Sequence, residues 1–111
     1  MANHILDRLY EILQERKSAD PDISYVAKLY NDGTGKCAQK FGEEAVETVI
    51  EAMKIESGDK LARAAFAEEA ADAVFHLMVL CTKLEIEPDL IWAVLEKRFG
   101  QTGIRSGPVH H

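Results

Sequence analysis

Four carboxylate side chains stand in two pairs with the same three-residue spacing, Glu44-x-x-Glu47 and Glu69-x-x-Asp72. Residues three apart on a helix are neighbours on one face, so each pair is expected to present two carboxylates in the same direction. Two such pairs on facing helices can bring all four carboxylates to one point. Oxygen ligands of this kind suit a hard divalent cation, Mg²⁺ or Mn²⁺. The spacing therefore predicts a metal site made by Glu44, Glu47, Glu69 and Asp72.

The second pair lies in an apolar segment, residues 61–84. From Ala73 to Thr82 this segment has no formally charged residue, and a helix that is apolar all round is normally buried. An ionised carboxylate that is buried without a partner is costly and would normally take up a proton. We therefore expect a cation beside Glu69 and Asp72, and a metal ion shared with the other pair is the simplest candidate.

The first pair also has an ordinary explanation. Glu44 and Glu47, with Glu51 continuing the row, are typical of the solvated face of a surface helix. The apolar setting of the second pair favours the metal site over that explanation. A di-iron site would need Glu-x-x-His motifs, and neither acidic pair supplies one. His76, one turn after Asp72, is expected to be a hydrogen-bonded core residue or a residue just outside the site.

Several basic residues are candidates for contacts with phosphate groups. They are Lys36, Lys40, Lys97, Arg98 and Arg105. Each one alone is typical of an ordinary surface charge, but Lys40 lies one turn before the first acidic pair. Glu43 and Glu68 each precede a motif acid by one residue, which is about 100° around a helix. Glu43 could join the cluster from the side, whereas Glu68 is expected to pair with a basic residue.

Composition and charge narrow the class of protein. A chain of 111 residues is typical of one domain. The formal net charge of −6 disfavours a general nucleic-acid-binding protein, although metal ions can still bridge carboxylates to the phosphates of a nucleotide. The two cysteines show no disulfide or zinc-site spacing, and the first helix region does not resemble a signal peptide. We therefore expect a cytoplasmic protein, without membrane contact because acidic residues interrupt its longest apolar stretch.

Helical periodicity runs through the chain, and no segment alternates with a period of two for long enough to predict a strand. The pattern predicts an all-α bundle of about five helices in a single domain over residues 1–111. The expected helices cover about 3–17, 24–30, 36–56, 59–84 and 88–99, followed by a flexible tail over about 101–111. Ser24 and Asp59 are expected to be N-caps, and Ser57-Gly58 is expected to close the third helix.

The fourth helix is long for a chain of this size. At ~1.5 Å per residue it would span roughly 40 Å, whereas a compact monomer of this length has a radius of gyration of about 13 Å. Such a helix would leave apolar surface in contact with water. We therefore expect a homodimer or higher homo-oligomer in which the long helices form a shared bundle.

The ordered set of motifs resembles a known family. Gly42-Glu43-Glu44-Ala45-Val46-Glu47, followed by Glu69-x-x-Asp72, resembles the acidic signature of the all-α nucleotide pyrophosphohydrolases. Within that superfamily the chain is most similar to the phosphoribosyl-ATP pyrophosphohydrolases of histidine biosynthesis. The resemblance covers residues 3–103, and its further motifs lie at 24–29, 33–40, 76–77 and 95–98.

This resemblance implies Mg²⁺-dependent hydrolysis of 1-(5-phosphoribosyl)-ATP to 1-(5-phosphoribosyl)-AMP and pyrophosphate. It also implies that the four acids hold the metal, and that Lys40 and the basic end of the fifth helix bind phosphates. The chain is expected to be the stand-alone form, because it lacks the length and the cysteines for the zinc-dependent cyclohydrolase fused to many relatives. Two alternatives stay open: a housekeeping pyrophosphohydrolase of free (deoxy)nucleoside triphosphates, and a non-catalytic helical dimerisation module without metal dependence.

Overall fold

The all-α prediction is confirmed in a computed structural model of the chain, which describes residues 4–101. Within that range there are five α-helices, one short 3-10 helix and no strand. They are α1 (Ile5–Glu15), η1 (Arg16–Ser18), α2 (Tyr25–Asp32), α3 (Thr34–Glu56), α4 (Ala62–Lys83) and α5 (Asp89–Gln101). The expected flexible tail beyond Gln101, with Arg105, His110 and His111, lies outside the described residues.

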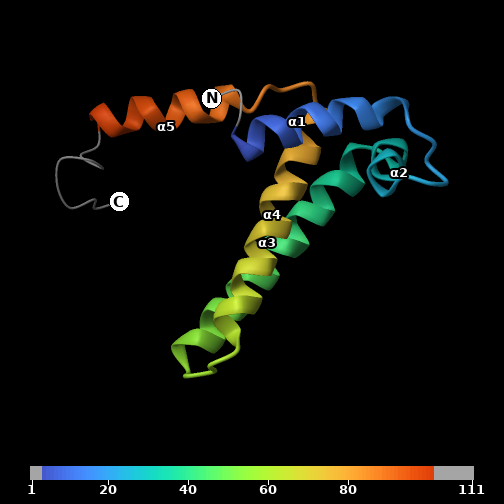
Figure 1. The fold of residues 1–111 in the computed structure, drawn as a ribbon. Helices are drawn as coiled ribbons and strands as arrows, with labels where there is room; N and C mark the ends of the chain where they lie inside the picture. The colour runs from blue at the N-terminus through green and yellow to red at the C-terminus, as the bar shows by residue number, and fades with distance from the viewer. Residues whose placement is uncertain (1–3, 102–111) are drawn as a thin grey trace.

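Helices α3 and α4 form an antiparallel hairpin that runs down the middle of the molecule (Figure 1). The turn at its tip depends on Gly58, whose φ of +97° lies in the left-handed region that favours glycine. The Gly58 N–H donates to the carbonyl of Ile55, and the Asp59 N–H donates to that of Lys54, which is the Schellman closure. The predicted end of the third helix is therefore confirmed.

The start of α4 differs from the prediction. Asp59 does not cap the helix, which begins only at Ala62; its carboxylate instead accepts from the N–H of Leu61, at 2.9 Å, within the turn. The physical reason is that Asp59 belongs to the Schellman closure at the end of α3, so it lies in the turn and not directly before the first residue of α4.

At the start of α2 the prediction is confirmed, because the Ser24 hydroxyl accepts from the N–H of Ala27 at 3.1 Å.

The hydrophobic core lies at one end of the hairpin, where α1 and α2 pack against it (Figure 1). Its buried members are Leu13, Val26, Leu29, Tyr30, Cys37, Met78 and Val79. The Tyr30 hydroxyl donates to the carbonyl of Leu13 at 3.0 Å and lies 2.6 Å from the hydroxyl of Thr82. One buried phenol thereby connects α1, α2 and α4, and this end of the hairpin fixes the relative position of α3 and α4.

The rest of α4 is less covered than the sequence indicated. The expectation of a helix buried all round is wrong for the single chain, because among residues 4–101 the N-terminal half of α4 is covered mainly by α3 (Figure 1). Buried side chains are concentrated from His76 onward, whereas Asp72 is exposed and Glu69 is half-buried. A cation is therefore not required by burial at Asp72.

The chain is elongated, with a radius of gyration of 16.4 Å and extents of 47 × 36 × 27 Å. A compact chain of this length would have a radius of gyration of about 13 Å. Helix α5 contributes to the shape because it extends sideways from the end of the hairpin (Figure 1). Across residues 4–101, none of the helices has the length and apolar character needed to cross a bilayer.

Candidate active site

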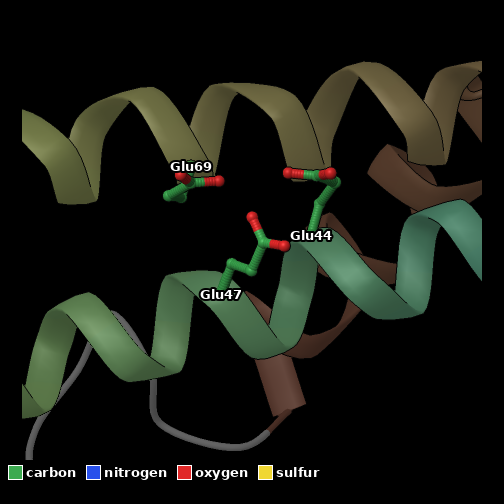
Figure 2. Close-up of side chains that lie close together, drawn as sticks. All are labelled: Glu44, Glu47 and Glu69. Atoms are coloured by element: carbon green, nitrogen blue, oxygen red, sulfur yellow. The ribbon is translucent and has the colours of Figure 1, made fainter.

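Three of the four predicted carboxylates meet between the two helices of the hairpin. Glu44 and Glu47 extend from α3 and Glu69 extends from α4 into the space between them (Figure 2). One oxygen from each of the three lies within 4.8 Å of the others. The three-residue spacing places the α3 pair on one face, and the antiparallel packing brings Glu69 opposite to it.

The crowding of these acids changes the protonation of Glu69. A hydrogen bond with Glu47 is the largest cause that raises the pKa of Glu69 to about 7, followed by partial desolvation and a hydrogen bond with Glu44. Carboxylates this close cannot all be ionised without a compensating positive charge. Without a cation Glu69 keeps its proton up to about pH 7, and the three acids together could offer three oxygen ligands to a metal ion.

Asp72 lies one turn along α4 from Glu69, on the side of the hydrophobic core. Its side chain is exposed and does not belong to the group of three whose oxygens meet. Its charge nevertheless contributes to raising the pKa of Tyr25, an effect whose largest cause is burial of the phenol. Asp72 therefore lies near the cluster, and its role as a metal ligand stays a prediction.

Lys40 lies among the same groups. Its ammonium is 3.2 Å from the carboxylate of Glu43, which also accepts from Gln39 at 2.7 Å. The pKa of Lys40 is raised, first by the hydrogen bond to Glu43 and then by the charges of Tyr25 and Glu44. Lys40, the predicted phosphate contact, therefore places a positive charge close to the acids. Glu43 pairs with Lys40 and does not belong to the cluster of three.

The other predicted phosphate contacts are placed differently. Lys36 is exposed in the first turn of α3, and Lys97 and Arg98 are on the exposed part of α5. Helix α5 points away from the hairpin (Figure 1). Within the single chain, the structure does not bring Lys97 and Arg98 to the acids, so their phosphate contacts stay a prediction.

The sequence did not single out Tyr25, which the structure places beside the acids. Its hydroxyl lies 3.5 Å from Nε2 of His76, and the two rings are T-shaped with centroids 6.0 Å apart. His76 is 5% exposed, which confirms the predicted core histidine. No spacing rule could have found the pair, because 51 residues separate the two side chains along the chain.

This donor set fits a divalent metal ion on chemical grounds. The cluster offers only carboxylate oxygens, which are the ligands that Mg²⁺ and Mn²⁺ prefer. One oxygen of each acid lies within 4.8 Å of the others, and this crowding raises the pKa of Glu69 to about 7, first through the hydrogen bond with Glu47. A divalent cation would replace the proton of Glu69, and Lys40 supplies a second positive charge for an anionic substrate beside it.

Comparison with known proteins gives a consistent family. The family model for phosphoribosyl-ATP pyrophosphohydrolase matches residues 6–99, which include all the site residues described above. The phosphoribosyl-ATP pyrophosphatase of Azospirillum brasilense is 55% identical over 90% of this chain and 85% of its own length. Those of Paramagnetospirillum magneticum and Cereibacter sphaeroides are 49% and 48% identical over 90% of this chain, and 86% and 91% of their own lengths. The chain therefore belongs to the phosphoribosyl-ATP pyrophosphohydrolase family.

Proposed function

We propose that this protein hydrolyses 1-(5-phosphoribosyl)-ATP to 1-(5-phosphoribosyl)-AMP and pyrophosphate, the second step of histidine biosynthesis, with Mg²⁺ as the cofactor. The observation that carries the proposal is the meeting of Glu44, Glu47 and Glu69 between two helices of a chain that belongs to this family. Mn²⁺ would fit the same oxygen ligands.

Glu44, Glu47 and Glu69 would hold the metal, with Asp72 as a fourth ligand from the next turn of α4. A Mg²⁺ ion held by these acids would supply the positive charge that offsets the charge of the triphosphate and of the leaving pyrophosphate. The acids arrive from two helices that a buried core holds in register, so the ligands are positioned before the substrate binds. Phosphoryl transfer depends mainly on such positioning and on charge neutralisation.

Lys40 supplies the positive charge that the protein itself places beside the acids. Its pairing with Glu43 keeps the ammonium charged and holds it next to the cluster. Oxygens of the triphosphate can compete with Glu43 for this ammonium, which orients the phosphoanhydride towards the acids. A carboxylate of the cluster then accepts the proton of the attacking water as the bond to pyrophosphate breaks.

The exposed apolar face of α3 supports a homodimer as the working form. Val46, Val49, Ile50 and Met53 are 59%, 60%, 47% and 61% exposed. They lie on the hairpin of an elongated chain, and a second copy packed against this face would complete a bundle of long helices.

We also infer a cytoplasmic location, because both cysteines are buried and unpaired, as a reducing compartment would allow.

The direct test is the release of pyrophosphate from phosphoribosyl-ATP by the purified protein, with Mg²⁺ and with the metal removed by a chelator. Rapid release only with Mg²⁺ is the expected result. Release from dCTP or other free nucleoside triphosphates, but not from phosphoribosyl-ATP, would replace the proposal with the housekeeping activity. A folded protein that is inactive on every substrate, with and without metal, would leave the non-catalytic dimerisation module.

A further inference from the structure

A tyrosine that no metal or phosphate motif includes, Tyr25, has its hydroxyl against His76, which lies one turn of α4 beyond Asp72. Tyr25 is the first residue of α2 and is 51% exposed, with its hydroxyl part-buried beside His76. The charges of Lys40, Glu44 and Asp72 all contribute to its pKa, although burial is the largest cause of the increase. The phenol is thus near both the cation and the acids that the proposed reaction uses.

The position of this hydroxyl is controlled by a buried histidine. His76 Nε2 lies 3.5 Å from the Tyr25 oxygen, and Phe75 packs its ring edge against the imidazole with centroids 5.1 Å apart. His76 is buried and burial lowers its pKa, so the ring is neutral and carries one N–H. Which nitrogen carries that proton determines whether the Tyr25 hydroxyl donates to His76 or is free to donate elsewhere.

The environment of the second ring nitrogen decides between the two tautomers. His76 Nδ1 is buried and has no hydrogen-bond partner among the described residues. A buried N–H without an acceptor is rarer and more costly than a buried lone pair without a donor. The proton therefore belongs on Nε2, which donates to the Tyr25 oxygen. The hydroxyl proton of Tyr25 is then not used in the contact with His76 and can be donated to another acceptor.

We propose that the Tyr25 hydroxyl donates a hydrogen bond to a phosphate oxygen of the substrate, and that His76 is the positioning residue that turns this hydroxyl outward. The inference rests on the proposed function, because it supplies a neutral donor for the phosphates that Lys40 and the metal ligands would bind. No charge moves in this step. The hydroxyl keeps its proton throughout and serves only to bind and orient the phosphate.

Kinetics of the full-length chain test the role of the hydroxyl. Tyr25→Phe removes only the oxygen, and loss of one hydrogen bond to a charged group is expected to lower kcat/KM about 10- to 100-fold. Tyr10→Phe is the matched control, since that hydroxyl is also half-buried but accepts from Gln14 on α1, outside the site. Tyr10→Phe is expected to keep the wild-type kcat/KM. Equal activity of both variants and the wild type would overturn the proposal.

The role of His76 is tested by two replacements of similar size. His76→Gln keeps an N–H donor close to the position of Nε2, whereas His76→Leu removes it. Both lose the imidazole packing against Phe75, so a merely structural histidine would give equal activities. A positioning histidine predicts higher kcat/KM for His76→Gln than for His76→Leu.

Two further measurements separate this inference from the proposed reaction. Nitrogen-15 NMR of the histidine ring should show the proton on Nε2; a proton on Nδ1 would overturn the proposal, because Tyr25 would then donate to His76. Calorimetric titration with inorganic pyrophosphate and Mg²⁺ should show weaker binding by Tyr25→Phe than by Tyr10→Phe. If the wild type fails to hydrolyse phosphoribosyl-ATP, the proposed function fails while these two measurements still decide the role of Tyr25.

Discussion

Glu47 and Glu69 lie on opposite helices of the α3–α4 hairpin, and their side-chain oxygens meet in the space between the two helices (Figure 2). A hydrogen bond between the two carboxyl groups is the largest cause that raises the pKa of Glu69 to about 7. Two carboxylates can be joined by a hydrogen bond only while one of them is protonated. The protein without bound cations therefore holds a proton at the place where the proposed metal would bind, and proton and metal compete for it.

The first prediction concerns stability without metal. Glu69 has an ordinary pKa of 4.5 in the unfolded chain and about 7 in the folded one, so the folded state binds the proton more tightly. This stabilising effect is complete below about pH 4.5 and is lost as the pH rises through about 7. In chelator, the melting temperature should fall more steeply over this range for the wild type than for Glu69→Gln. Identical pH dependence of the two proteins would contradict the hydrogen bond between Glu47 and Glu69.

The second prediction concerns protons released on metal binding. Near pH 7 about half of the Glu69 carboxyls carry a proton in the metal-free protein, and a metal ion that binds the cluster must displace it. Calorimetric titration with Mg²⁺ in two buffers of different ionisation enthalpy should therefore show proton release. The release should disappear well above pH 7 and in Glu69→Gln. Binding heat that does not depend on the buffer would place the metal elsewhere.

The third prediction concerns the acids in catalysis. Glu47→Gln and Asp72→Asn keep the shape of the side chain but remove its charge, so each should lower kcat/KM by at least about 100-fold without loss of fold. Circular dichroism would verify the helices. Glu68→Gln is the matched control, because Glu68 is exposed on α4 next to Glu69 and should keep wild-type activity. Near-normal activity of Asp72→Asn would reduce the site to the three acids that meet.

The fourth prediction concerns the end of α4. Glu85 has a φ of +59°, and its N–H and that of Ile86 complete the same closure that Gly58 makes at the end of α3. A residue with a Cβ is strained in this conformation and glycine is not. Glu85→Gly should therefore stabilise the protein by about 0.5–1 kcal/mol in chemical unfolding. Gly58→Ala should have the opposite effect, and a loss of stability in Glu85→Gly would refute the account.

The fifth prediction concerns the proposed homodimer. Val49→Asp places a charge in the middle of the exposed apolar face of α3, where Val49 is 60% exposed. Burying that charge against a second copy is costly, so light scattering should show a shift from dimer to monomer. Ile23→Asp changes an equally aliphatic side chain, 85% exposed, outside α3 and should stay dimeric. A wild-type protein that is already monomeric would refute the dimer.

The sequence predicted those features of this molecule that depend on residues close together in the chain. The Ser24 cap, the Gly58 closure and the shared face of Glu44 and Glu47 each depend on residues within a few positions of one another. The approach of Glu69 followed from the assumption that the two acidic helices face each other. The exposure of Asp72 did not, because it depends on how much of α4 the other helices cover.

The contact between Tyr25 and His76 and the altered pKa of Glu69 could not be predicted from the sequence either. Each depends on a distance between atoms on different helices, and a shift of one turn between the packed helices would remove it. A helical pattern gives the face on which a side chain lies, but it does not give the register of two packed helices. Those properties could only be obtained from the three-dimensional arrangement.

The placement of the core at one end of the hairpin has an evolutionary consequence. Tyr30, Met78 and their neighbours hold the helices together at that end, whereas Glu44, Glu47 and Glu69 lie further towards the tip and contribute crowded charge. Substitutions around the acids can therefore alter the chemistry of the site while the folding of the chain is preserved. Because the crowded acids repel one another, selection for stability alone would tend to remove them. Their retention in a lineage would therefore indicate selection for the reaction that they serve.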